Sequence, residues 1–150
     1  MTEKADNKKL SDITNEMLKA LSPYVSSAEY YYRCGTIYNS NCDTENAIQS
    51  FSKAIDLNPE YIHAYLSRGG CYSVKRDYGK AIEDFSRMIE LKPEFGIGYL
   101  NRGITYYHQK KYLEARKDLE KCIDLEDDGV RTAKRVLRDI ENKQSEKTND

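Results

Sequence analysis

The chain has 150 residues, of which 24 are basic and 25 acidic, so its formal net charge at pH 7 is −1. A charge this close to zero provides no net attraction to nucleic acid or to an anionic membrane surface, and we expect neither as a partner. No apolar run is long enough to span a membrane, and the polar, acid-containing N-terminus is unlike a secretory signal. We therefore expect a cytoplasmic protein whose core needs neither metal nor disulfide.

The N-terminal segment, residues 1–27, is polar and contains one short helix, predicted over 12–22. Apolar residues recur there at helical spacing after the capping residue Ser11: Ile13, Met17, Leu18 and Leu21. Pro23 ends this helix. Ser26 and Glu29 have the spacing of a capping box, which predicts that the next helix begins here.

From residue 28 the sequence repeats with a period of 34 residues, in three copies that span 28–61, 62–95 and 96–129. The positions in step are Tyr31, Tyr65 and Tyr99; Gly35, Gly69 and Gly103; Tyr38, Tyr72 and Tyr106; Ala47, Ala81 and Ala115; and Phe51 and Phe85, with Leu119 in the third copy. Pro59 and Pro93 close the first two copies, and Asp127 stands at that place in the third. A period of this length predicts units that must stack on one another to bury their apolar faces.

Apolar spacing predicts two helices in each copy. The first helices are predicted over 28–41, 62–75 and 96–109, and the second over 45–57, 79–91 and 113–125. A glycine inside a helix costs about 1 kcal/mol relative to alanine, so the recurring glycine of the first helix indicates close approach of the second, with the recurring alanine at the same contact. A final helix over 130–144 has one apolar face and would close the stack, and residues 145–150 form a flexible tail.

Together, the aromatic, glycine, tyrosine, alanine, phenylalanine and proline positions resemble the tetratricopeptide repeat family over about residues 28–127. The resemblance implies an all-α, right-handed α-solenoid whose first helices line a concave groove that binds a peptide. The residues it implies for this groove are Tyr32, Arg33, Thr36, Asn39, Leu66, Ser67, Gly70, Ser73, Leu100, Asn101, Ile104, Tyr107 and His108.

Within this set, we expect apolar contacts from Tyr32, Leu66, Leu100 and Ile104 and hydrogen bonds from Asn39, Asn101 and His108. The same residues also fit a second interpretation, in which they form the wall of the solenoid or touch the N-terminal or C-terminal helix.

One subset of the family binds the C-terminal carboxylates of heat-shock chaperones with two lysines, two asparagines and an arginine. The corresponding residues here are Tyr32, Thr36, Ser67, Ile97 and Asn101. Burying a carboxylate without a cation is costly, so we do not expect chaperone tails to bind through such a clamp.

Two charge pairs recur at a spacing of 16 residues: Arg68 with Asp84, and Arg102 with Asp118. The first copy has Cys34 and Ser50 at these places, so both charges are absent together. We interpret the pairs as salt bridges between the two helices of a copy; an arginine without its partner would instead be a ligand contact.

The final helix has a basic stripe consisting of Arg131, Lys134, Arg135 and Arg138. It could meet an acidic partner segment, although a stripe at helical spacing also fits a solvated face diluted by Asp139 and Glu141. RNA binding would need aromatic rings among these charges, and this helix has none.

Catalytic and metal chemistry find no support in the sequence. His63 and His108 have no acid or nucleophile at triad-like placement, and no cysteine lies at metal-ligand spacing from them. We expect buried, reduced thiols at Cys34, Cys71 and Cys122 and an exposed one at Cys42, in a loop. The chain is therefore not expected to be an enzyme or to hold a cofactor.

The sequence thus predicts a protein-interaction module or adaptor that binds a protein or peptide ligand, as a monomer rather than a homodimer. Three alternatives stay open: a self-assembling scaffold, a small secretion-type chaperone, and a regulatory subunit of a partner enzyme.

Overall fold

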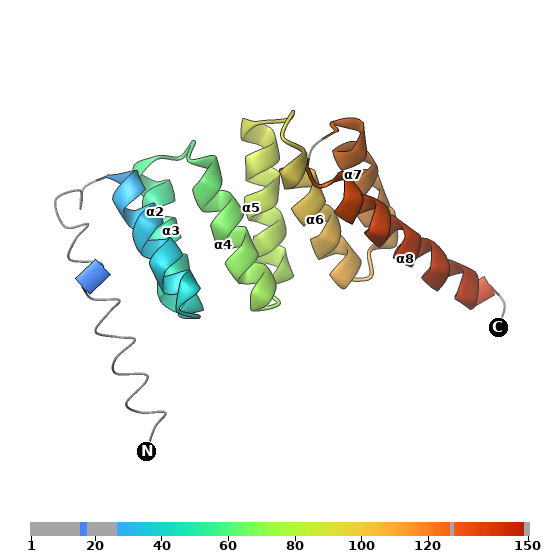
Figure 1. Ribbon diagram of the computed structural model, residues 1–150, viewed down its shortest axis with the longest axis horizontal. Coiled ribbons are helices and arrows are strands. Elements are labelled where there is room, and N and C mark those ends of the chain that lie inside the picture. The colour runs from blue at the N-terminus through green and yellow to red at the C-terminus, as the bar shows by residue number, and fades with distance from the viewer. Residues whose placement is uncertain (1–15, 18–26, 127, 149–150) are drawn as a thin grey trace, which may run out of the picture. The chain divides into compact units, whose positions relative to one another are not determined.

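The computed structural model describes residues 16–17, 27–126 and 128–148, and all the regular structure in these ranges is helical (Figure 1). The helices of the repeats are α2 (Ala28–Ser40), α3 (Thr44–Leu57), α4 (Ile62–Val74), α5 (Tyr78–Leu91), α6 (Gly96–His108) and α7 (Tyr112–Asp124), followed by α8 (Val130–Thr148). The first six agree with their predicted bounds to within one residue, whereas α8 continues four residues beyond its predicted end. Of the helix predicted over 12–22, only residues 16–17 lie in the described part, and they are helical.

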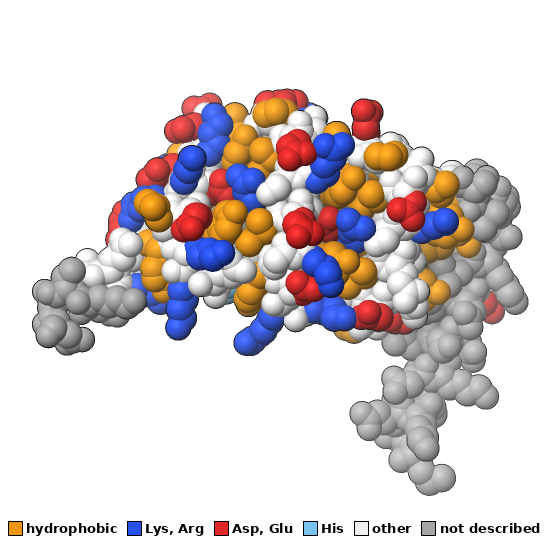
Figure 2. Space-filling model, turned by 180° about the vertical axis from the view of Figure 1, so that it is seen from behind, with side chains coloured by type: hydrophobic (Ala, Val, Ile, Leu, Met, Phe, Trp, Pro, Cys, Tyr) orange, Lys and Arg blue, Asp and Glu red, His pale blue; other side chains and the backbone are white. Residues whose placement is uncertain are grey.

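The chain divides into two compact units, residues 1–71 and residues 72–150. The first contains α2, α3 and most of α4, and the second contains α5 to α8. In the first unit α2 packs on α3; in the second, α6 packs on both α5 and α7, and α8 packs on α7 and α6. On the face shown in Figure 2, cations and carboxylates are interspersed, as the near-zero net charge leads one to expect.

Helix α2 begins at its predicted residue, Ala28, and its N-cap is Ser27. The Ser27 hydroxyl accepts a hydrogen bond from the Tyr30 backbone N–H at 3.0 Å. The carboxylate of Glu29 accepts a bond from the guanidinium of Arg33. The N-cap is therefore Ser27, one residue after the predicted one, and the predicted bond from Glu29 back to Ser26 lies outside the described residues.

In the first unit, α2 and α3 approach so closely that only a glycine fits at residue 35. A Cβ at Gly35 would lie 2.5 Å from the ring of Phe51, which is fully buried. The prediction of close approach is confirmed. The atoms nearest to that Cβ belong to Phe51, however, and not to the recurring alanine, Ala47.

The second unit has a looser version of the same contact. A Cβ at Gly103 would lie 3.0 Å from Leu119, the leucine that stands where the first copy has Phe51. Leu119 belongs to a core formed by α6, α7 and α8 that consists of Leu100, Ala115, Leu119, Cys122, Ala133 and Ile140. Helix α8 therefore contributes to this core with its predicted apolar face.

The salt bridge between Arg102 and Asp118 is confirmed. Two guanidinium nitrogens of Arg102 donate to the carboxylate of Asp118 at 2.7 and 2.9 Å, and a third donates to Ser86 at 2.9 Å. Arg102 thus ties α6 to the second helices on both sides, α5 and α7, and the bond to Asp118 raises the pKa of its guanidinium. In the first unit Arg68 donates to Ser52, at the position that matches Ser86. The pairing of Arg68 with Asp84 would join residues of the two units, and it stays a prediction.

The cysteines lie where the sequence predicted them. Cys34, Cys71 and Cys122 are buried, and Cys42 is exposed. Cys42 lies in the turn between α2 and α3 with a left-handed backbone, φ 60°, and Arg76 and Lys110 adopt the same conformation in the next two copies. No helix in the described ranges is long and apolar enough to cross a membrane.

Candidate functional site

Helix α2 presents a polar, exposed face in the first unit. Its exposed residues fall three to four positions apart and include Glu29, Arg33, Thr36 and Asn39, while Cys34 and Gly35 face the core. Arg33 is not a lone cation, because its guanidinium donates to the carboxylate of Glu29 at 2.8 Å. The three predicted groove residues Arg33, Thr36 and Asn39 therefore share one accessible surface.

Glu29 also joins α2 to the residue that precedes α4. The phenol of Tyr61 donates a hydrogen bond to its carboxylate. Arg33, and then Tyr61, hold the pKa of Glu29 below its ordinary value of 4.5, whereas burial and the bond to Glu29 raise the pKa of Tyr61. This network fixes one edge of the α2 face.

The side-chain amide of Asn39 is hydrogen-bonded through its oxygen only. Its side-chain oxygen accepts a weak bond from the thiol of Cys71 at 3.4 Å, and within the described residues its amide N–H groups have no acceptor. The neighbouring Thr36 hydroxyl donates to the carbonyl of Arg33, so its oxygen keeps its capacity to accept. Both side chains can bond to an approaching backbone.

The side chain of Tyr32 is partly buried and packs against other aromatic rings. Its ring lies 5.8 Å from that of Phe51, 5.1 Å from that of Tyr61 and 6.4 Å from that of His63, measured between centroids. The other predicted residues of the first unit, Leu66, Ser67 and Gly70, are partly buried on α4, with open space beside Gly70.

Leu100 has the same repeat position as Tyr32, two copies later, and was predicted to line the groove, but it is buried. It is 6% exposed and belongs to the core of the second unit, where a Cβ on Gly129 would lie 2.6 Å from it. The chain that enters α8 therefore covers Leu100, so this side chain is not available to a ligand. The sequence predicted where α8 begins, but it did not reveal that the backbone at Gly129 lies against Leu100.

Tyr107 likewise bonds to α8. Its phenol donates to the carboxylate of Asp139 and accepts from the ammonium of Lys143, which also donates to Asp139 at 2.6 Å. Lys143, followed by Tyr107, lowers the pKa of Asp139, and the bond to Asp139 raises the pKa of Lys143. Leu100 and Tyr107 therefore fit the second interpretation of the sequence, in which the predicted residues touch the C-terminal helix.

The remaining predicted residues of the second unit differ in accessibility. Asn101 is partly buried and donates to the carbonyl of Ile97 at 2.8 Å, which leaves its side-chain oxygen without a donor among the described residues. Ile104 is partly buried against the core, and Ser73 has a buried hydroxyl without a partner in the described part. His108 is exposed, with its ring stacked on Tyr78 at 6.1 Å.

Two features of these surfaces were not recognised in the sequence. The tyrosine–carboxylate bonds, Tyr61 with Glu29 and Tyr107 with Asp139, both join residues 32 apart. A tyrosine and an acidic residue separated by 32 positions, two fewer than the repeat period of 34, would have indicated each bond in the sequence. No group of three or more potential metal ligands lies together within the described ranges.

Comparison with known proteins identifies the architecture. Models of the tetratricopeptide repeat match residues 28–61, 62–95 and 97–128. An uncharacterized protein of Methanocaldococcus jannaschii is 41% identical over 44 residues, which make up 29% of this chain and about half of that protein, 51%.

Solved structures show the same fold over most of the chain. The crystal structure of MamA superposes with a TM-score of 0.70 at 30% identity, covering 83% of this chain and 71% of MamA. The first repeat domain of Spaghetti (RPAP3), bound to an HSP90 peptide, superposes with a TM-score of 0.73 at 24% identity, covering 79% of this chain and 96% of that domain.

Proposed function

Because this chain belongs to the tetratricopeptide repeat family, whose members are protein-interaction modules, we propose that it binds a peptide segment along the exposed faces of its first helices. In this proposal the chain is a non-catalytic module or adaptor, and its partner is a protein. The peptide bound to the similar domain of Spaghetti supports this class of ligand.

The observation that carries the proposal is the accessible face of α2. Thr36 and Asn39 are exposed there and each keeps hydrogen-bonding capacity that no described residue uses. A peptide in extended conformation has unpaired N–H and C=O groups along its length, which such side chains can bond. Asn101 offers a free oxygen on α6 in the same way.

Apolar contacts in this proposal come from a smaller set than the sequence predicted. Leu100 is covered, and the ring of Tyr32 packs on Phe51 and Tyr61. Leu66 and Ile104 keep part of their surface accessible. The expected ligand is therefore bonded mainly through its backbone and polar groups, with few apolar anchors.

The test is a selection of peptides from a random display library against the intact chain, followed by affinity measurements by fluorescence anisotropy. Thr36→Tyr places a ring on the exposed face of α2, and we expect it to weaken the selected peptides at least about tenfold, the order of one or two lost hydrogen bonds. Gln49→Tyr is the matched control, because Gln49 is exposed on the second helix α3. Equal effects of the two variants, or none from Thr36→Tyr, would contradict the proposal.

A further inference from the structure

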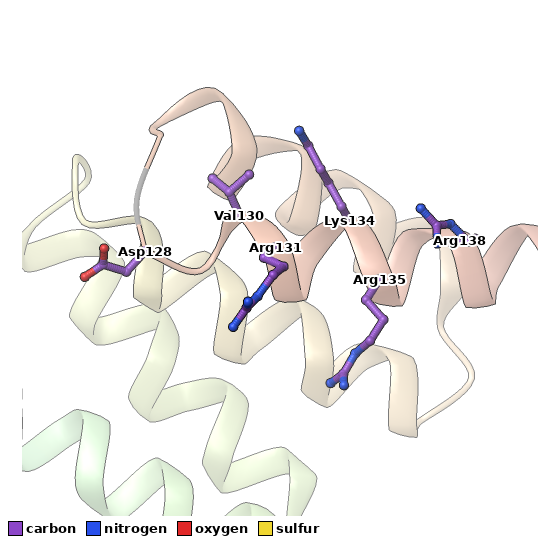
Figure 3. Close-up of a pocket in the computed structure, with 6 residues that line it drawn as sticks. All are labelled: Asp128, Val130, Arg131, Lys134, Arg135 and Arg138. Atoms are coloured by element: carbon purple, nitrogen blue, oxygen red, sulfur yellow. The ribbon is translucent and has the colours of Figure 1, made fainter.

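Helix α8 has four exposed cations that no acid of the described chain neutralises. Arg131, Lys134, Arg135 and Arg138 form no ion pair or hydrogen bond with any side chain in the described ranges. Together with Asp128 and Val130 they line a surface hollow of about 620 Å³ (Figure 3). We call this surface the α8 basic face.

The two carboxylates of α8 that follow these cations in sequence are engaged by other residues. Asp139 bonds to Lys143 and Tyr107, and Glu141 accepts from Arg116 of α7 at 3.4 Å. These two acids therefore join α8 to α6 and α7 and form no ion pair with the α8 basic face. The acid that lines the hollow itself is Asp128, and the four cations form no ion pair with it.

The same register positions carry different chemistry in the earlier first helices. At the places of Arg131, Arg135 and Arg138, helix α6 has Ile97, Asn101 and Ile104. Helix α2 has Glu29, Arg33 and Thr36 there, and its one cation is paired with its one acid. A continuous cationic face thus occurs on α8 and on neither of these two helices.

The arrangement of the arginines suits a particular spacing of negative charge. Arg131 and Arg135 extend to the same side of α8, and Lys134 points away from them (Figure 3). One turn separates the two arginines, about 6 Å along the helix axis. Alternate side chains of an extended peptide are separated by about 6.6 Å, so two carboxylates at positions i and i+2 match this pair.

We propose that the α8 basic face binds an acidic segment of the partner protein, in extended conformation and with carboxylates at alternate positions. The inference rests on the proposed peptide-binding function and adds the chemistry of the ligand. Each arginine can form charge-assisted, two-pronged bonds to a carboxylate. Nucleic acid is disfavoured as the occupant, because none of the six lining residues is aromatic and the whole chain is near neutral.

The probe for this site is a short labelled peptide of alternating glutamate and alanine with both termini blocked, which removes any free terminal carboxylate. Its matched control contains glutamine in place of glutamate. We expect the intact chain to bind the glutamate peptide in a fluorescence titration, to bind it more weakly as sodium chloride is raised, and to bind the glutamine peptide at least about tenfold more weakly.

The double variant Arg131→Glu/Arg135→Glu reverses the pair, and we expect it to weaken the glutamate peptide at least about tenfold. Lys53→Glu/Lys121→Glu changes the net charge equally at exposed lysines of α3 and α7, and we expect it to retain binding. Circular dichroism and thermal unfolding check that all variants remain folded.

The inference is overturned by any of three results: no binding of the glutamate peptide, equal weakening in both double variants, or a labelled single-stranded oligonucleotide that binds more tightly and is lost in Arg131→Glu/Arg135→Glu. Its failure is separate from that of the proposed function. Thr36→Tyr tests the α2 face with selected peptides, whereas the arginine pair is tested with a defined acidic probe.

Discussion

Helices α2 and α6 occupy the same place in their repeats, yet one has an open polar face and the other is largely covered. On α2, Arg33, Thr36 and Asn39 are exposed. On α6, Leu100 is buried and Tyr107 bonds to α8. The difference comes from what packs beside each helix and not from the repeat pattern, which the two helices share.

The comparison shows that register in a repeat fixes which way a side chain points, but its neighbours decide what that side chain does. Tyr32 and Leu100 have the same register, and both contact the chain that leads into the following first helix. Lys134 has this register in α8 and is exposed. The same register position therefore packs against the chain at Tyr32 and Leu100 and is exposed to solvent at Lys134.

The largest difference in stability between variants of the two units is expected at the glycines where two helices pack, Gly35 and Gly103. Gly35→Ala forces a Cβ against the ring of Phe51, and we expect a loss of about 2–3 kcal/mol of unfolding free energy, as for overpacked cores. Gly103→Ala meets the flexible side chain of Leu119 at 3.0 Å, so we expect a loss of at most about 1 kcal/mol after the helix-propensity gain. Denaturant unfolding measures both.

The matched control is Gly70→Ala, because a Cβ at Gly70 has nothing within 4 Å. This variant should gain up to about 1 kcal/mol from helix propensity alone. Equal losses at Gly35 and Gly103 would show that the phenylalanine-to-leucine difference does not distinguish the two helix pairs.

The second contrast is the ion pair, which the third copy has and the first lacks. Arg102→Cys leaves the carboxylate of Asp118, 5% exposed, without its partner, and we expect a loss of about 3 kcal/mol. Arg102→Cys/Asp118→Ser installs the residues of the first copy, Cys34 and Ser50, and should recover about 1 kcal/mol because no buried charge remains.

Urea unfolding of the two variants measures this cycle. Arg33→Cys is the control, since it breaks an exposed pair that is expected to contribute less than about 0.5 kcal/mol. If the double variant were less stable than Arg102→Cys, an unpaired Asp118 carboxylate would not be what destabilises the single variant.

The smallest expected effect is the pH dependence of the two tyrosine–carboxylate networks. Folding lowers the pKa of Glu29 and of Asp139, so the unfolded state binds more protons just below their ordinary values, 4.5 and 3.8. The stability they contribute is present above those values and is lost as pH falls through the lowered pKa. Glu29→Gln and Asp139→Asn should each flatten the decline of Tm on acidification.

Thermal unfolding as a function of pH measures these slopes. Glu45→Gln, at an exposed residue of α3 outside both networks, provides the comparison. If the Glu29→Gln and Asp139→Asn profiles ran parallel to that of the intact chain, neither network would contribute to stability.

The sequence by itself determined the repeat architecture. Tyrosines, glycines and alanines in step at 34 residues fixed the helix bounds to within one residue, because periodic burial constrains each copy in the same way. The spacing of 16 residues also predicted the bond between Arg102 and Asp118, since it joins facing positions of two antiparallel helices.

Only the tertiary structure decided which first-helix residues are accessible. The burial of Leu100 depends on the packing of Gly129 against it, and the pairing of Arg33 depends on the rotamers of two long side chains. Asp139, four residues after Arg135, bonds instead to Lys143 and to Tyr107 of α6. A periodic pattern encodes which side faces the core, but the partners of surface charges are set by contacts between different helices, and these have no period.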